Sequence, residues 1–307
     1  MPKPPNILLV VTDQQRPDTI GCLGQQPVST PVLDRLAREG TLFDRCYTPC
    51  PLCTPARASL LSGQYPSRHG AWSIGVDTPD DVLSLPALLS SQAGYRTALV
   101  GKSHFKACLG EGSFESVPSV HDWDKFRNWS GPWFGFDYAK ICVGPVNEPH
   151  ACGMHYGLWL QERGIDPVKP YFGPRTDPEF SEDGNGEWKL PLEFHPCKWA
   201  ADESIAFIEQ SRGSDQPFFL SLNLPEPHRP FLVPAPYHEM YEDTALNAPV
   251  RRPDEHLGKP TFYKACVDKT TDTLGWHDEY LPMGQTSLSG SHESPEREPR
   301  EERYWRT

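Results

Sequence analysis

Basic residues are scarce in this sequence of 307 residues. Lysine and arginine number 29 against 41 aspartates and glutamates, which gives a formal net charge of −12 at pH 7. Nucleic acids and anionic membranes are therefore not expected as partners, because binding them requires a basic surface that displaces counterions. An anionic small molecule would need a local group of cations to attract it.

Long apolar runs are missing as well. The run Asn6–Val11 has six residues and leads directly into the polar run Thr12–Asp18, so it is too short for a signal peptide or a membrane span. The nine cysteines are an odd number, and Cys50 and Cys53 lack the second pair that a zinc site requires. We therefore expect a cytoplasmic protein with neither a disulfide framework nor structural zinc.

The composition is that of a globular protein with many loops. Hydrophobic residues make up 37% of the chain, and its 34 prolines favour rigid surface connections of the kind that often build pockets. Short apolar runs alternate with segments of helical periodicity, which predicts an α/β fold with a mostly parallel sheet flanked by helices. The predicted strands are residues 6–11, 41–43, 97–100 and 217–224, and the predicted helices are residues 31–39, 56–61, 85–92 and 199–210.

Two segments depart from this alternation. Residues 109–196 are rich in glycine, proline and aromatic residues with little periodicity, and we interpret them as a large insertion over one end of the sheet. From residue 285 the composition changes to serine, glycine, glutamate, arginine and proline, which predicts a polar, disordered tail over residues 285–307. Residues 1–284 would form one α/β domain.

The most informative stretch reads Pro-Leu-Cys-Thr-Pro-Ala-Arg-Ala-Ser-Leu-Leu-Ser-Gly and covers residues 51–63. It places Cys53 at the entrance of a helix, where backbone N–H groups favour an anion, with Arg57 one turn further along. This arrangement suits a reactive thiolate or an anion site. It also suits a small buried cysteine in front of an ordinary helix.

The pattern Cys-x-Pro-x-Arg, followed by two leucines and a small residue before glycine, closely resembles the signature of the type I sulfatases of the alkaline-phosphatase-like superfamily. In that family a formylglycine-generating enzyme oxidises the cysteine, and the hydrated aldehyde is the nucleophile. The resemblance implies that Cys53, once oxidised, attacks the sulfur of a small-molecule sulfate ester and expels the alcohol. Elimination of sulfate then restores the aldehyde. Arg57 belongs to the same signature and is a candidate catalytic residue.

Asp13 and Gln14 come just after the first predicted strand. Open α/β sheets bind ligands at the carboxyl ends of their strands, and carboxylate and amide oxygens suit Ca²⁺, Mg²⁺ or Mn²⁺; an aspartate that only forms a turn is the alternative. Asp-Gln in place of Asp-Asp resembles the sulfatase and phosphonate monoester hydrolase branch of the superfamily. The resemblance implies a divalent metal, with Ca²⁺ preferred, held by Asp13, Gln14 and the oxidised Cys53.

Two further motifs resemble sulfatase segments. Gly-Lys-Ser-His after a predicted strand implies that Lys102 neutralises a sulfate oxygen and that His104 moves protons on the nucleophile. Pro-His-Arg-Pro after another predicted strand implies that His228 contacts the sulfate or protonates the leaving alcohol. His69 and His155 are weaker candidates: His69 either lines the site or only packs, and His155 is a candidate for shaping the substrate pocket.

The resemblance extends over approximately residues 4–270 and lacks one part of the family pattern. Members of the family continue with an apolar strand that ends in an Asp-His or Asp-Asn pair and supplies further metal ligands, and no such strand follows here. A truncated sulfatase-like catalytic domain is therefore expected, and a sulfuric ester hydrolase is the leading prediction. The alternatives are a phosphonate or phosphate monoester hydrolase of the same superfamily, a catalytically inactive truncated fragment, and an enzyme that uses the unmodified Cys53 thiol.

Overall fold

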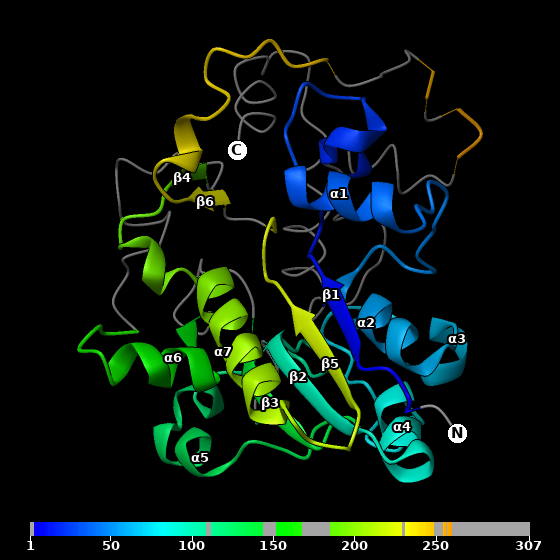
Figure 1. Cartoon of the computed structure of the whole chain (residues 1–307), viewed down its shortest axis with the longest axis vertical. Helices are drawn as coiled ribbons and strands as arrows, with labels where there is room; N and C mark the ends of the chain where they lie inside the picture. The colour runs from blue at the N-terminus through cyan, green and yellow to red at the C-terminus, as the bar shows by residue number, and fades with distance from the viewer. Residues whose placement is uncertain are drawn as a thin grey trace. The chain divides into compact units, whose positions relative to one another are not determined.

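The computed structural model of the protein describes residues 3–108, 112–143, 152–167, 185–228, 231–248, 254–255 and 257–259. The chain divides into two compact units, one formed by Met1–Gln15 with Cys46–Ala235 and the other by Arg16–Arg45 with Pro236–Thr307. The first unit holds a parallel sheet flanked by helices (Figure 1), which confirms the predicted α/β class. The tail predicted at residues 285–307 lies outside the described residues.

Four parallel strands form the central sheet in the order β1-β5-β2-β3. Val11 of β1 and Gly101 of β2 both pair with Asn223 of β5, so these three strands end at the same edge of the sheet. The residues that follow each strand are therefore brought together at this edge. The strands are β1 (Ile7–Val11), β2 (Arg96–Lys102), β3 (Tyr138–Cys142) and β5 (Phe218–Asn223).

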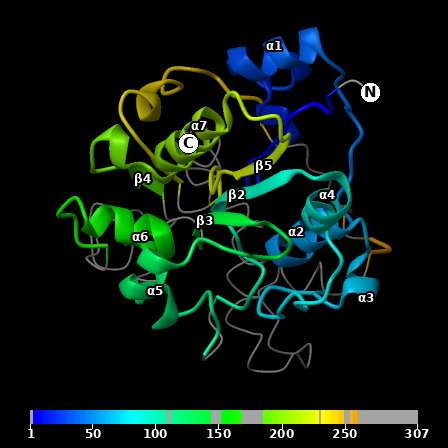
Figure 2. The same cartoon turned by 60° about the horizontal axis from the view of Figure 1, so that its bottom comes forward.

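Helices cover both faces of this sheet. Helix α7 packs on one face against β2 and β5, whereas α4 packs against β2 from the other side together with α2 (Figure 2). Trp199 and Phe207 of α7 enter the main apolar core, where they join Leu220 of β5. The helices of this unit are α2 (Cys53–Ser62), α3 (Pro66–His69), α4 (Leu85–Ala93), α5 (Trp123–Asn128), α6 (Met154–Gln161) and α7 (Pro196–Ser211).

The helix ends follow signals in the sequence. Helix α4 begins where the Ser84 side chain accepts a hydrogen bond from the Ala87 N–H, and it ends at Gly94 in a left-handed conformation. Helix α2 begins at Cys53, three residues earlier than predicted. The missing N–H of Pro55 does no harm there, because the first turn of a helix leaves its N–H groups without helical partners.

Two parts of the chain differ from the sequence-based expectation. The strand predicted at residues 41–43 is wrong: this segment is irregular and exposes Leu42 and Phe43, so its short apolar run did not mark a buried strand. The segment predicted as an insertion, residues 109–196, supplies β3 of the central sheet as well as α5 and α6. The other described strands are β4 (Asn185–Glu187) and β6 (Phe231–Val233), which pair with each other, and helix α1 (Pro31–Glu39) belongs to the second unit.

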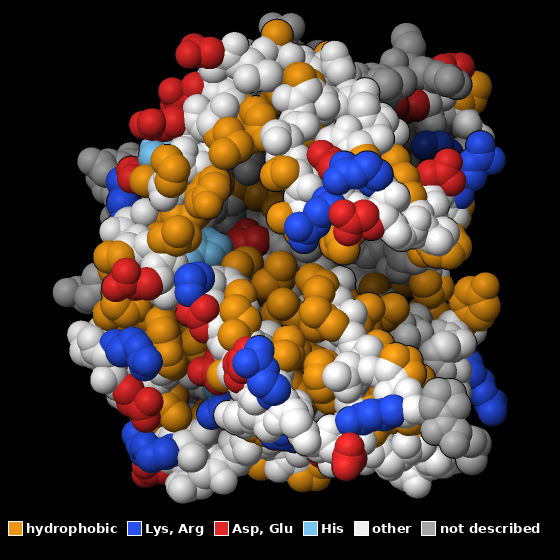
Figure 3. Space-filling model, viewed as in Figure 1, with side chains coloured by type: hydrophobic (Ala, Val, Ile, Leu, Met, Phe, Trp, Pro, Cys, Tyr) orange, Lys and Arg blue, Asp and Glu red, His pale blue; other side chains and the backbone are white. Residues whose placement is uncertain are grey.

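The edge strand β1 presents an apolar face on the surface of the first unit. Leu8 and Val10 are 50% and 51% exposed. In Figure 3, apolar side chains gather over β1 and β5. None of the helices in the described ranges combines the length and the apolar character that crossing a membrane requires.

Substitution of Gly101 gives a test of how closely the backbones of β2 and β5 approach each other. It has a φ of 98°, and a Cβ atom there would overlap the carbonyl oxygen of Asn223. We predict that Gly101→Ala lowers the free energy of unfolding by about 3 kcal/mol or more, because left-handed strain adds to the overlap. Gly94→Ala is the matched control, since Gly94 has a φ of 70° and open space around it. It should lose only about 1–2 kcal/mol. Equal losses in urea unfolding would contradict the close approach.

Candidate active site

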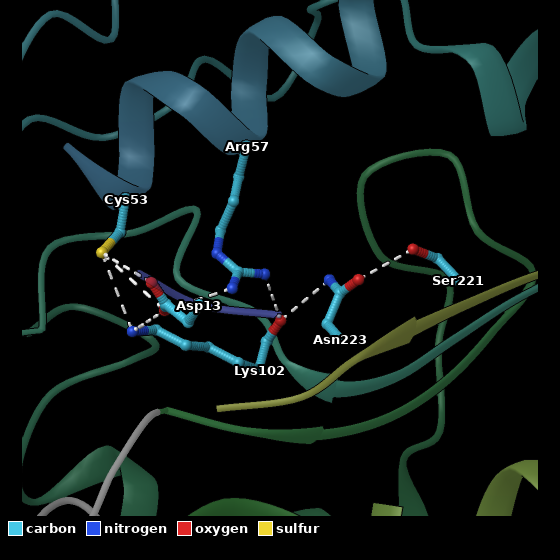
Figure 4. A network of polar contacts seen from close by, with 6 residues as sticks. All are labelled: Asp13, Cys53, Arg57, Lys102, Ser221 and Asn223. Carbon is cyan, nitrogen blue, oxygen red and sulfur yellow. Dashed lines mark hydrogen bonds and ion pairs between the residues drawn. The ribbon is translucent and has the colours of Figure 1, made fainter. Parts of the chain in front are cut away.

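Four side chains meet where β1, β5 and β2 end (Figure 4). Asp13 follows β1, Lys102 is the last residue of β2, and Cys53 and Arg57 lie on the first two turns of α2. The alignment of the strand ends brings the first two together, and the amino end of α2 points at them. The structure thus unites four residues that the sequence motifs selected from three distant segments.

Asp13 is the anionic centre of this group. Lys102 Nζ contacts Asp13 Oδ2, and Arg57 Nη2 lies 3.3 Å from the same oxygen. All three side chains are buried. Burial by itself would raise the pKa of Asp13, but the adjacent Lys102 and Arg57 cations outweigh it and hold the pKa well below its usual range. Asp13 is therefore ionised at neutral pH.

Lys102 stays charged although it is almost completely buried, with 1% of its surface exposed. Burial lowers the pKa of a lysine, but Asp13 and Cys53 raise it by more, so the pKa of Lys102 lies above its usual value. Lys102 and Arg57 share the single Asp13 carboxylate, which leaves one surplus positive charge. Glu226 does little to reduce it, because burial raises the pKa of that carboxyl well above its usual value. A buried surplus charge of this kind favours an anionic ligand.

Cys53 lies beside this charged group as the first residue of α2. Its Sγ is 3.6 Å from Asp13 Oδ1 and 3.8 Å from Lys102 Nζ. Burial raises the pKa of the Cys53 thiol, Lys102 opposes the rise, and Asp13 adds to it, with a net upward shift. Because the thiolate and not the thiol is the nucleophile, this upward shift of the pKa disfavours an enzyme that uses unmodified Cys53.

A second layer of hydrogen bonds fixes the end of β2. The Lys102 carbonyl oxygen accepts from Arg57 Nη1 at 3.0 Å and from Asn223 Nδ2 at 3.0 Å. Ser221 Oγ in turn donates to Asn223 Oδ1 at 2.9 Å. The motif analysis missed Asn223, although an amide at the end of a predicted strand could have marked it.

His104 is buried in the same region, and neither of its ring nitrogens has a hydrogen-bond partner among the described residues. Burial lowers its pKa well below the usual value, and Lys102 and Arg57 lower it further, so the ring is neutral. Leaving buried polar atoms unpaired costs about 1–3 kcal/mol, and such atoms in a charged site indicate a ligand position. His228 is half-buried and close enough to lower the pKa values of Asp13 and His104.

The two weaker histidine candidates have packing contacts. His69 Nδ1 accepts the Ala71 N–H at 3.2 Å, so its Nε2 donates to Ser59 Oγ at 2.9 Å and ties α3 to α2. His155 Nδ1 accepts the Ile141 N–H at 3.1 Å, and its Nε2 donates to the Trp129 carbonyl at 2.8 Å. Both rings are therefore used within the scaffold.

The described residues could supply only some of the ligands of a divalent metal ion. Asp13 offers carboxylate oxygens and Cys53 lies beside it, whereas Gln14 follows with an exposed side chain and a φ of 60°. Within the described ranges, no group of three or more His, Cys, Asp or Glu residues could hold an ion. Ca²⁺ takes about six to eight oxygen ligands, so these residues would supply a part of its shell.

The family model described as Sulfatase matches residues 5–274. The chain belongs to the sulfatase family. This family is part of the alkaline phosphatase superfamily. The match spans the Cys53 signature and the segments that carry Asp13, Lys102, His104 and His228, so the residues gathered at the sheet edge all lie within the matched region.

Curated relatives extend well beyond the matched region. The chain is 29% identical over 274 residues to an uncharacterised sulfatase of Escherichia coli K12, with 89% of this chain and 48% of that protein covered. It is 29% identical over 265 residues to an arylsulfatase of Clostridium perfringens, with 83% and 51% covered. The chain thus spans about half the length of these relatives.

A solved structure shares the fold. The phosphonate monoester hydrolase of Agrobacterium radiobacter superposes with a TM-score of 0.61 at 26% identity, over 81% of this chain and 46% of that chain. The proteins that this chain resembles thus include both sulfatases and a phosphonate monoester hydrolase.

The ion pairs of Asp13 give a stability prediction. Asp13→Asn should lower the free energy of unfolding by about 3–5 kcal/mol at pH 7, because it leaves the buried Lys102 and Arg57 without a counter-charge. Asp202→Asn is the control, since Asp202 pairs with Lys198 on the exposed surface of α7. It should lose about 0.3–0.5 kcal/mol.

The same variant predicts a pH dependence. The folded-state pKa of Asp13 is depressed, so its stabilising contribution is present above the unfolded-state pKa of about 3.9 and is lost as the pH falls below it. The difference between wild type and Asp13→Asn should therefore shrink under acid. A constant difference in urea unfolding between about pH 3 and about pH 7 would contradict the assignment.

Proposed function

We propose that the protein is a sulfuric ester hydrolase that cleaves a sulfate monoester with residue 53, oxidised from cysteine to formylglycine, as its nucleophile. The observation that carries this proposal is the surplus positive charge of Lys102 and Arg57 over Asp13, located directly beside Cys53. This charge explains how a chain with a net charge of −12 could attract an anion. Membership in the sulfatase family supports the reaction class.

The residues have distinct roles in this proposal. Lys102 neutralises a sulfate oxygen, and Arg57 holds both Asp13 and the backbone of Lys102 in place. His104 is neutral and has no ring hydrogen-bond partner among the described residues, so its ring accepts a proton from the nucleophile. His228, in the segment that follows β5, contacts the sulfate or protonates the leaving alcohol. The amino end of α2 adds a favourable electrostatic field for the anion.

Two groups would complete the site. Oxidised Cys53 would supply a hydrated aldehyde whose hydroxyl attacks the sulfur atom. A divalent cation, with Ca²⁺ preferred because the donors are oxygens, would polarise the sulfate and the nucleophile. Asp13, Gln14 and residue 53 would hold it, and its other ligands would have to come from outside the described residues or from water.

The single surplus positive charge of the site side chains favours a substrate with one negative charge. A sulfate monoester carries one negative charge, which matches the one surplus positive charge, whereas a phosphate monoester carries about −1.5 to −2 at pH 7. A phosphonate monoester also carries one charge. Phosphonate monoester hydrolysis is therefore the second candidate, and the likeness to a phosphonate monoester hydrolase structure supports it.

The remaining partners are proposals as well. A formylglycine-generating enzyme would mature Cys53, and the acidic chain is expected to bind neither nucleic acid nor anionic membranes. A cytoplasmic location remains a prediction from the sequence. The inactive-fragment alternative also stands, since the chain spans about half the length of its curated relatives.

Maturation of Cys53 is measurable by mass. Coexpression with a formylglycine-generating enzyme should lower the intact mass by about 18 Da, and the product should hydrolyse 4-nitrophenyl sulfate. Cys53→Ala should show no mass loss and at least a thousandfold lower turnover, roughly as expected for removal of a nucleophile. Cys50→Ala is the matched control, because Cys50 is another free cysteine close by in the chain. It should keep both the mass loss and the turnover.

Each other outcome selects an alternative. Mass loss without turnover of sulfate or phosphonate esters would favour the inactive fragment. Turnover without mass loss would favour an unmodified thiol enzyme. Faster turnover of an aryl phosphonate monoester than of the aryl sulfate would favour the second candidate.

Metal binding has a readout independent of turnover. Ca²⁺ should raise the thermal midpoint of the matured protein, and EDTA should reverse the shift, because an ion that binds the folded state at 100 times its Kd stabilises by about 2.7 kcal/mol. Gln14→Ala should reduce the shift without changing the metal-free midpoint, because the Gln14 side chain is exposed. A matured wild type that does not respond to Ca²⁺, Mn²⁺ or Mg²⁺ would contradict the proposed metal.

A further inference from the structure

The turn that carries His104 has a strained backbone. His104 follows β2 with a φ of 59°, in the left-handed region that residues other than glycine seldom adopt. Such strain persists only where the surrounding structure holds it in place. The neighbours of His104 must therefore include the contacts that fix this turn.

Glu115 supplies contacts on both sides of His104. Its Oε1 accepts a hydrogen bond from Ser103 Oγ at 2.7 Å and from the Phe105 N–H at 3.2 Å. Ser103 Oγ also accepts from Trp133 Nε1 at 2.7 Å. The residues immediately before and after His104 are thus both hydrogen-bonded to the Glu115 carboxyl group. The Trp133 indole adds a further hydrogen bond to the Ser103 hydroxyl.

Burial of the Glu115 carboxyl group at this position costs free energy. It is completely buried, and none of the described residues forms an ion pair with it. Burial raises its pKa to about 7, although Ser103 and the backbone N–H groups of Phe105 and Lys106 lower it. The charged groups that influence it from neighbouring elements are few, chiefly Arg57 of α2, whose charge lowers the pKa. A buried carboxyl retained without a counter-ion calls for a specific task.

We propose that Glu115 is a positioning residue for His104: by holding the Ser103 hydroxyl and the Phe105 amide, it fixes the turn that directs the His104 ring into the anion site. His104 follows Lys102 by two residues, the charges of Lys102, Arg57 and Asp13 act on its buried ring, and neither ring nitrogen has a hydrogen-bond partner in the described part of the chain. The inference rests on the proposed function for its catalytic meaning, whereas the conformation of the turn is testable without turnover.

Three variants separate positioning from packing. Glu115→Gln keeps an oxygen acceptor of the same shape, Glu115→Ala removes both hydrogen bonds, and Ser103→Ala removes the hydroxyl bond alone. The readout is the ¹⁵N NMR spectrum of histidine-labelled protein, with the His104 ring assigned by its loss in His104→Asn. We expect the ring signals to move and the ring pKa to rise in Glu115→Ala, to shift less in Ser103→Ala, and to stay near wild type in Glu115→Gln. Unchanged His104 signals in folded Glu115→Ala would overturn the proposal.

If Glu115→Ala does not fold, Ser103→Ala decides in its place, and unchanged His104 signals in Ser103→Ala overturn the proposal equally.

In matured protein, kcat for an aryl sulfate should fall on the order of 100-fold in Glu115→Ala with a smaller change in KM, because a displaced catalytic group affects mainly the chemical step. Glu115→Gln should recover most of this loss. A wild type without turnover would contradict the proposed function. The positioning role of Glu115 would then be tested by the NMR result alone.

A pH profile identifies the carboxyl itself. Because the folded-state pKa of Glu115 is raised to about 7 from the ordinary 4.5, the protonated form stabilises the fold at low pH, and this contribution is lost as the pH rises through the folded-state value. Cys108 and Cys142 also face Glu115, but burial raises their pKa values to about 11 and about 12, so they do not titrate in this range. Wild type should therefore lose thermal stability relative to Glu115→Gln between about pH 5 and about pH 8. Parallel profiles would overturn the buried placement on which the proposal depends.

Discussion

The site depends on one carboxylate that two buried cations share. Asp13 keeps Lys102 and Arg57 charged inside the protein, and these cations in turn keep Asp13 ionised. The arrangement requires β1, β5 and β2 to end at one edge, because Asp13 follows β1 whereas Lys102 is the last residue of β2. It also requires α2 to begin at that edge, which places Cys53 beside the charges. The charged group therefore forms only if the register of the sheet and the start of α2 are both correct.

Much of this could be predicted from the sequence because the signals were local. The branched apolar residues of β1 and the capping residues of α4 act within a few positions, and both elements appear where they were expected. The side chains of Asp13, Cys53, Arg57 and Lys102 were selected by short motifs. The parallel sheet then brought them within contact, since parallel strands place their carboxyl ends at one edge.

The rest depended on tertiary contacts that leave no local pattern. Strand β3 lies in a stretch without clear periodicity, and pairing with β2 makes it a strand. Asn223 and Glu115 serve the site through hydrogen bonds to Lys102 and to the neighbours of His104. A lone glutamate in a glycine-rich and aromatic segment carries no sign of such a partner. Apolar residues 41–43 mislead for the same reason, because a short run does not reveal what it will pack against.

The ion-paired group of Asp13, Lys102 and Arg57 beside residue 53 is our proposed oxyanion site. The most direct test is a crystal structure of the matured protein grown with inorganic sulfate. We expect a sulfate ion beside residue 53, within hydrogen-bond distance of Lys102 Nζ and a ring nitrogen of His104. A site that stays free of sulfate at saturating concentration, with the His104 ring bonded to a protein partner instead, would contradict it.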